Sequence, residues 1–136
     1  RQSFDRQQFM RTLNASLLSV EPGFVEIELP VDETVTQQHG FVHAGAVASI
    51  ADSACGYAAF SLMPADAGVL AVEFKINLMA PAAGEKLIAR ARVVRAGRTL
   101  TVCQADVSAV IDGQERLVAI MTSTIMTVRD REGVRG

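Results

Sequence analysis

Residues 37–63, QQHGFVHAGAVASIADSACGYAAFSLM, join a polar, glycine-containing segment to a long run of small apolar residues. From Ala44 to Ala59 nearly every position holds Ala, Ile, Val, Ser or Gly, and no proline interrupts the run. This composition predicts a long helix. We expect the helix to end by Met63, because Pro64 has no N–H to donate and disfavours helical geometry in the residue before it.

Asp52 is the single charged residue of this run. A helix with so many small side chains is thin, so a carboxylate on it has few local partners. Burial would raise the pKa of that carboxylate and make it a usable base near neutral pH. At the helix start, near His43 to Gly45, backbone N–H groups lack intrahelical acceptors and can hold an oxyanion. An acid and a helix start of this kind suggest a hydrolytic site.

Length and composition limit the class of protein. The 136 residues are 49% apolar and 21% charged, which predicts one globular domain over residues 1–136. A net charge of −2 and the lack of Trp argue against nucleic acid as a partner. Cys55 and Cys103 lack metal-ligand spacing, and we expect reduced, buried thiols in a cytoplasmic protein.

One segment has the length of a membrane span. It runs from Ala44 to Ala65, but Ala, Gly and Ser insert weakly, and a central Asp52 costs roughly 2.5–3.5 kcal/mol. We therefore expect no contact with a membrane. The polar, charged N-terminal segment also predicts no secretory signal.

Strand patterns lie on both sides of the helix, and one short amphipathic helix is expected over Phe4–Leu13. Turn signals separate the strands, among them the Asp112-Gly113 pair of a tight hairpin. The predicted strands are residues 15–20, 24–29, 69–79, 86–95, 99–111 and 117–128. Along residues 69–79, the alternation predicts one apolar face, with Leu70, Val72, Phe74, Ile76 and Leu78, and one polar face, with Ala71, Glu73, Lys75 and Asn77. Residues 129–136 are expected to be a frayed end.

Six strands with one long helix between the second and third describe an α+β fold. The late strands are joined by turns too short for crossovers, so the six-stranded sheet is antiparallel. Such a sheet curls around the central helix and buries one face on it. Since little of the chain is left to cover the other face and the edges, we expect a homo-oligomer.

The motif before the helix resembles the signature of the hotdog-fold acyl-CoA thioesterases, specifically the PaaI-like branch. That signature, Asn-x-x-Gly-x-x-His-Gly-Gly followed by a helix with an acid, reads here as Gln37-x-x-Gly40-x-x-His43-Ala44-Gly45 with Asp52. Residues 72–102, VEFKINLMAPAAGEKLIARARVVRAGRTLTV, are also similar to the family. The resemblance covers about residues 15–128.

The resemblance implies a role for each matching residue. Asp52 would be the general base or the nucleophile, and the backbone N–H of Ala44 would hold the thioester oxygen. Gln37 stands where the family has an Asn that positions the water or the carbonyl. His43 would shape the helix start, and Gly40 and Gly45 would contact the substrate.

The resemblance also implies how substrate is held. The acyl group would lie against the helix and apolar strand residues, among them Tyr57 and Phe74. Gly97, Arg98 and Thr99 would contact the phosphates of coenzyme A, which enters only as part of the substrate, and no cofactor or metal is implied. In the family, the acid of one subunit faces the other subunit's glycine-containing loop, in a homodimer or a dimer of dimers (a homotetramer).

Three residues depart from the family pattern. Gln37 is one methylene longer than the Asn, and Ala44 adds a methyl group where the family has the first Gly of its pair. Ala71 stands where some relatives have a hydroxyl, so a group that positions water is missing. These changes concern the rate and the choice of substrate rather than the fold.

Other interpretations of the same residues stay open. Asp52 could be a structural acid bonded to nearby groups. A metal site at His39 and His43 lacks further ligands, and Ser49 and Ser53 lie in no Gly-x-Ser-x-Gly elbow. The basic run of Arg90, Arg92, Arg95 and Arg98 is either a solvated face or a phosphate contact.

The sequence therefore predicts hydrolysis of an acyl-CoA thioester to a free acid and coenzyme A. A non-catalytic hotdog module that binds and senses acyl-CoA is the alternative. A hydratase of the same fold is a further rival, but that chemistry uses an Asp–His pair, and no His follows Asp52 at three to five residues.

Overall fold

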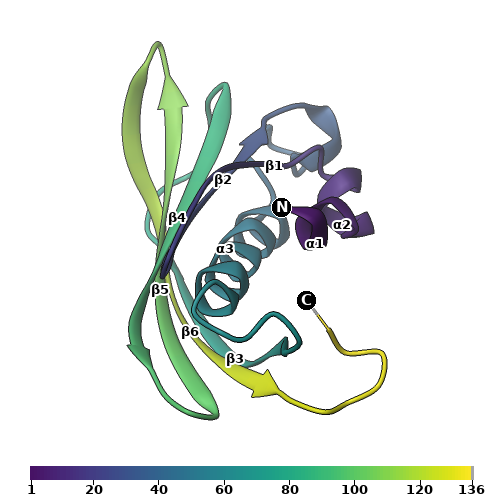
Figure 1. Ribbon diagram of the computed structural model, residues 1–136. Helices are drawn as coiled ribbons and strands as arrows, with labels where there is room; N and C mark the ends of the chain where they lie inside the picture. Colours follow the sequence, from purple (N-terminus) through teal and green to yellow (C-terminus); the bar gives the residue numbers. More distant parts are fainter. Residues whose placement is uncertain (136) are drawn as a thin grey trace.

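The computed structural model describes residues 1–135, in which a six-stranded antiparallel sheet curls around one long helix, α3 (Ala44–Phe60) (Figure 1). The strand order is β1-β2-β4-β5-β6-β3, which leaves β1 and β3 as the two edges. The strands are β1 (Ser16–Glu21), β2 (Phe24–Pro30), β3 (Gly68–Leu78), β4 (Lys86–Ala96), β5 (Leu100–Ile111) and β6 (Gln114–Val128). A short 3₁₀ turn, η1 (Glu33–Val35), precedes α3. The predicted fold class is confirmed.

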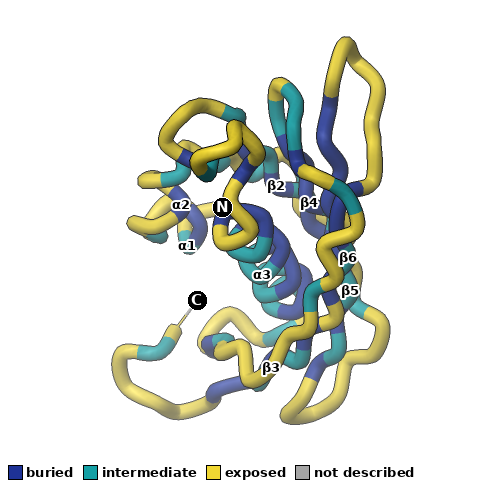
Figure 2. The backbone as a smooth tube through the Cα atoms, turned by 180° about the vertical axis from the view of Figure 1, so that it is seen from behind, coloured by how far each residue is buried: buried dark blue, intermediate teal, exposed yellow. Residues whose placement is uncertain are grey.

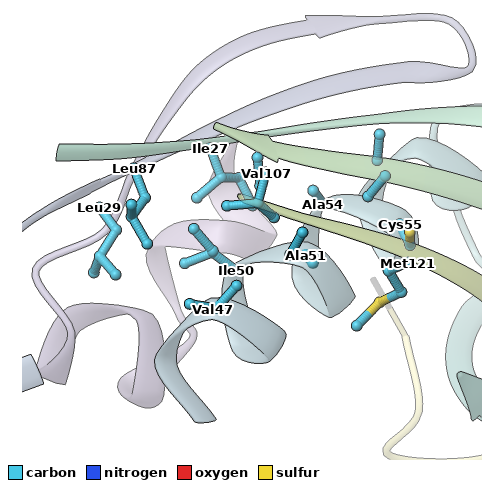
Figure 3. Packing of buried hydrophobic residues seen from close by; sticks show 14 of the residues in the cluster. Ile27, Leu29, Val47, Ile50, Ala51, Ala54, Cys55, Leu87, Val107 and Met121 are labelled. Atoms are coloured by element: carbon cyan, nitrogen blue, oxygen red, sulfur yellow. The ribbon is translucent and has the colours of Figure 1, made fainter. Parts of the chain in front are cut away.

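The helix α3 packs into the concave face of the sheet along one side only. Residues at helical spacing on that side are fully or almost fully buried, and Figure 2 shows the opposite side of α3 as partly exposed. Ile50 and Ala54 face strand residues such as Ile27 and Val107 across this contact (Figure 3). The small buried side chains of α3 and the apolar strand residues form one continuous hydrophobic core.

The N-terminal segment differs from the prediction of one helix over Phe4–Leu13. It forms two short helices, α1 (Gln2–Asp5) and α2 (Gln8–Thr12), with the extended residue Gln7 between them. In a single straight helix Phe4 and Met10 would point about 120° apart. The break lets both side chains enter the core, at 5% and 2% exposure. Both short helices lie on the side of α3 away from the sheet (Figure 1).

Strand β3 does not present one continuous apolar face. A bulge between Ala71 and Glu73 shifts its register against β6. Leu70 therefore lies opposite Met126, on the outer face of the sheet, whereas Phe74 lies opposite Ser123, on the face toward α3. The strict alternation expected over residues 69–79 is wrong at this point, because an extra residue reverses the direction of the side chains that follow.

The hairpin between β5 and β6 is longer than expected. Asp112 and Gly113 both have positive φ, 51° and 75°, which makes the tight two-residue turn that was predicted. Pairing begins directly beside it, with Ile111 opposite Gln114. The polar residues that open β6 have no apolar alternation, which explains why the predicted strand began only at residue 117.

Two further observations concern the chain as a whole. Residues 129–135 form no helix or strand, but Val134 contacts Gly68 at the start of β3. Within residues 1–135, no helix has the length and apolar character needed to cross a membrane.

Candidate active site

Asp52 lies in the middle of α3, on the partly exposed side of the helix. Its Oδ1 atom is buried and has no hydrogen-bond partner within residues 1–135. Burial raises the pKa of the Asp52 carboxyl group above its usual value. An isolated carboxylate with a raised pKa is the state that the sequence predicted for a general base.

A cavity of about 420 Å³ adjoins Asp52. One wall is α3 itself, from Asp52 to Phe60, and another is the start of β3, from Gly68 to Ala71. Residues close to the two chain ends complete it: Ser3, Gln7, Gly133, Val134 and Arg135. Asp52 therefore borders a partly open cavity with room for part of a substrate.

The start of α3 is held by His43, its N-cap residue. The Nδ1 atom of His43 accepts a hydrogen bond of 2.8 Å from the N–H of Gly45. The N–H groups of Ala46 and Val47 donate to the carbonyl oxygen of His43. A Cβ atom at Gly45 would lie only 2.9 Å from that ring nitrogen, so glycine is needed for the cap.

The backbone N–H of Ala44 is the one left open in this first turn, since it donates no hydrogen bond to any acceptor in residues 1–135. Ala44 is exposed and lines a second cavity of about 550 Å³. The positive end of the α3 dipole adds to this donor. The helix start can therefore accept a developing negative charge at Ala44.

Gln37, Gln38 and Phe41, from the loop before α3, line that second cavity. The N–H of Gln37 donates to the carbonyl of Phe41, and Gly40 has a φ of 85°, which favours glycine. The side-chain oxygen of Gln37 accepts a hydrogen bond from the N–H of His39. Gln37 therefore faces the second cavity with its oxygen already bonded, and its amide NH₂ is the group that can contact a substrate.

Within one chain, the two halves of the predicted site stay apart. Ala44 and Asp52 are eight residues apart in one helix, which is about 12 Å along its axis. No residue lines both cavities. Gln37, His43 and Ala44 line the second cavity, whereas Asp52 and Tyr57 line the first. One thioester group cannot contact both Asp52 and the N–H of Ala44 within a single subunit.

The predicted substrate contacts divide in the same way. Tyr57 lines the Asp52 cavity, where its hydroxyl lies 3.2 Å from Ser3 Oγ and its ring packs edge-on against Phe4. Phe74 lines neither of the two cavities, although it is 46% exposed on the α3 side of β3. The turn at Gly97–Thr99 is exposed and also lies outside both, and the carbonyl of Thr99 accepts from the N–H of Thr127.

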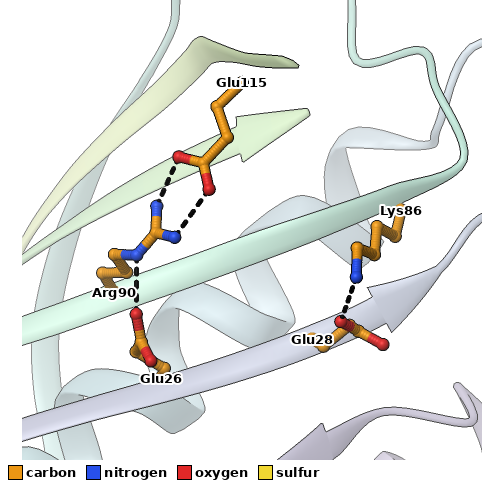
Figure 4. A network of polar contacts seen from close by, with 5 residues as sticks. All are labelled: Glu26, Glu28, Lys86, Arg90 and Glu115. Carbon is orange, nitrogen blue, oxygen red and sulfur yellow. Dashed lines mark hydrogen bonds and ion pairs between the residues drawn. The ribbon is translucent and has the colours of Figure 1, made fainter. Parts of the chain in front are cut away.

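Arg90 belongs to a network of ion pairs on the outer face of the sheet (Figure 4). Its guanidinium group donates to Glu26 at 2.7 Å and to both carboxylate oxygens of Glu115 at 2.7 Å. This pairing raises the pKa of Arg90 further above its usual value. Arg90 thus has protein partners, whereas Arg98 lies in the exposed turn.

Sequence reasoning missed the residues that close the Asp52 cavity from the chain ends. Ser3 lies in α1 and Gln7 between α1 and α2, and Val134 lies in the C-terminal segment, beside Gly68 at the start of β3. No local pattern marks these residues. Among residues 1–135, no three His, Cys, Asp or Glu side chains gather in a way that could hold a metal.

Comparison with known proteins places this geometry in a family. A family model described as the thioesterase superfamily matches residues 39–115. The chain is 32% identical over 104 residues to human acyl-coenzyme A thioesterase 13, covering 75% of this chain and 74% of the relative. A crystal structure of a thioesterase family protein from Silicibacter pomeroyi is 54% identical, with a TM-score of 0.93 and 95% of each chain covered.

The fold also matches the PaaI protein of the E. coli phenylacetic acid degradation operon. Its TM-score is 0.82 at 23% identity, over 98% of this chain and 91% of that one. The family model, which spans more than half of the chain, and the relatives named thioesterases agree with the motif at the start of α3. The chain belongs to the thioesterase superfamily, the thioester hydrolases of hotdog fold.

Proposed function

We propose that this protein hydrolyses an acyl-CoA thioester to a free carboxylic acid and coenzyme A, with Asp52 as general base or nucleophile. The observation that carries the proposal is the unpaired, buried Oδ1 of Asp52 at the wall of a cavity. A structural carboxylate would be expected to have hydrogen-bond donors around it. A carboxylate without them is available to water or to a substrate.

The chemistry follows from the two open groups. Asp52 takes a proton from water while the water oxygen attacks the thioester carbon. The carbonyl oxygen becomes negative and is held by the N–H of Ala44 and the α3 dipole. When the C–S bond breaks, the thiolate of coenzyme A leaves and takes up the proton. Direct attack by Asp52, with an anhydride that water then cleaves, gives the same products.

The free edge of β3 supports an active site shared between two subunits. Three of its apolar side chains are about half exposed, Val72 at 51%, Phe74 at 46% and Leu78 at 53%, on an unpaired edge of 11 residues. Such an edge pairs readily with a second copy. We propose a homodimer, alone or within a dimer of dimers, in which the two β3 strands pair antiparallel.

This pairing would unite the two cavities. The Asp52 cavity lies at the beginning of β3, at Gly68–Ala71, and the Ala44 cavity at its end, at Leu78 and Met79. In antiparallel strands about a two-fold axis near Phe74, the beginning of one strand lies beside the end of the other. Asp52 of one subunit would then face Ala44 and Gln37 of the partner subunit.

The turn at Gly97–Thr99 is proposed to contact the phosphates of coenzyme A, since it is exposed and offers the guanidinium group of Arg98. The reaction uses only water and the thioester, so we propose no cofactor. We also propose a cytoplasmic location, since Cys55 and Cys103 are both free thiols.

The test is thiol release from a panel of acyl-CoAs by the purified protein, with Asp52→Asn as the matched variant. The proposal expects release by the wild type and a loss of about 10²–10⁴-fold in the variant. Tight binding of acyl-CoA without release would instead favour a sensing module. Equal release by both proteins would remove Asp52 from the chemistry.

A further inference from the structure

Gly56 lies one helical turn after Asp52, well inside α3. Glycine in the interior of a helix is destabilising relative to alanine, since it leaves the unfolded chain more conformational freedom. A glycine at such a position therefore calls for a physical reason.

Nothing within the described chain requires a glycine here. Beyond its two sequence neighbours and the local helix backbone, a Cβ atom built at Gly56 meets no heavy atom within 4 Å. The other glycine of α3, Gly45, would place its Cβ 2.9 Å from His43, and at Gly68 a Cβ would lie 2.7 Å from the carbonyl oxygen of Val134. The space beside Gly56 is open, and its backbone is helical.

That open space belongs to the Asp52 cavity, which Gly56 lines. Residues four apart on a helix are neighbours on its surface, with about 5–6 Å between their Cβ atoms. The Cα–Cβ bonds of a helix tilt toward its N-terminus, so a side chain at position 56 would lean toward Asp52. A methyl group there would enter the cavity beside the carboxylate.

We propose that Gly56 is a specificity-determining residue that keeps the cavity wide next to the reacting carbon. This inference rests on the proposed thioesterase function and names its substrate class: acyl groups that are broad beside the thioester carbon, through branching or a ring. A straight alkyl chain is narrow at that point and does not need the space.

The test compares benzoyl-CoA, which is broad beside the carbonyl, with hexanoyl-CoA, which is narrow, in the wild type and in Gly56→Ala. We expect the ratio of kcat/KM for benzoyl-CoA to kcat/KM for hexanoyl-CoA to be about tenfold or more lower in Gly56→Ala than in the wild type. One methylene group in a pocket has an effect of about this size. The Tm of the variant should rise by roughly 2–4 °C, because alanine favours the helix. Lower stability together with a changed oligomer on size exclusion would overturn the proposal, because it would mean that another subunit packs on Gly56.

An unchanged ratio of the two kcat/KM values would also overturn it. Failure of the proposed function is detected separately, as a wild type that releases thiol from neither probe. In that case the inference is read from calorimetric binding of the same two probes to Asp52→Asn, with and without Gly56→Ala. Weaker binding of benzoyl-CoA alone in the double variant supports the role of Gly56. Equal binding, or no binding of either probe, contradicts it.

Discussion

Replacing Asp52 by asparagine should make the protein more stable at neutral pH while it removes the activity. The substitution keeps the shape of the side chain and removes its charge. In the folded protein that charge is partly buried, and one oxygen has no donor. Asparagine leaves a polar atom unpaired in the same place, so the gain is only the added cost of burying a charge there, at the lower end of the roughly 1–3 kcal/mol for a buried unpaired polar group.

The expected gain is therefore about 1 kcal/mol at pH 7.5, or roughly 3–4 °C in Tm for a chain of this size. Its pH dependence follows from the raised pKa of Asp52 in the folded state. The folded protein binds the Asp52 proton more tightly than the unfolded chain does. The free energy of unfolding of the wild type therefore falls as the pH rises from the ordinary Asp52 pKa of 3.8 through the raised pKa of the folded state. Below that range Asp52 is protonated in both states, and the advantage of asparagine should disappear.

Thermal unfolding of both proteins at pH 3.5 and at pH 7.5, where each unfolds reversibly, measures this difference directly. Asp52→Asn should have the higher Tm at pH 7.5 and a smaller or no advantage at pH 3.5. A lower Tm for the variant at pH 7.5 would refute the reasoning, because it would show that the carboxylate makes a stabilising contact. An equal gain at both pH values would attribute the effect to something other than the charge.

Three further predictions concern the helix start and the sheet edge. Ala44→Pro should fold, since Ala44 is the first helical residue and His43 before it already has the extended ψ of 136° that proline requires. Its kcat should fall about 10²–10³-fold, because the backbone N–H of residue 44 is gone. Ala44→Gly, which keeps that N–H, is the control. Gly45→Ala should displace the His43 ring and cost about 1 kcal/mol of unfolding free energy in urea denaturation, whereas an unchanged midpoint would mean that the cap matters little. Val72→Lys places a charge at the free edge of β3 and should shift the protein toward monomer on size exclusion, with loss of thiol release; a stable oligomer would place the interface elsewhere.

Much of the fold could be predicted because its signals are local. The run of small apolar residues from Ala44 predicted a long helix that ends before Pro64, and α3 spans Ala44–Phe60. The Asp112-Gly113 pair predicted the hairpin turn, where both residues have positive φ. Each depends on backbone preferences of a few neighbouring residues. The antiparallel sheet then follows from short connections.

What failed depends on contacts between distant segments. The bulge after Ala71 arises where β3 meets β6, and the break at Gln7 lets Phe4 and Met10 reach the core. The cavity beside Asp52 is closed by residues from both chain ends, which no spacing in the sequence could indicate. Phe74, which the resemblance implied as an acyl contact, lies outside both cavities of a single subunit, and its role stays a prediction.

The account depends most on an active site built from Asp52 of one subunit and the Ala44 helix start of the other. Mixing the two inactive variants, Asp52→Asn and Ala44→Pro, and allowing their subunits to exchange tests this directly. Each mixed dimer should contain one intact site, so thiol release should return to about a quarter of the wild-type rate, because about half of randomly formed dimers are mixed. If mixed dimers form, as mass spectrometry of the native complex can establish, and release stays at the level of the separate variants, the two groups do not meet across subunits and the proposed site is wrong.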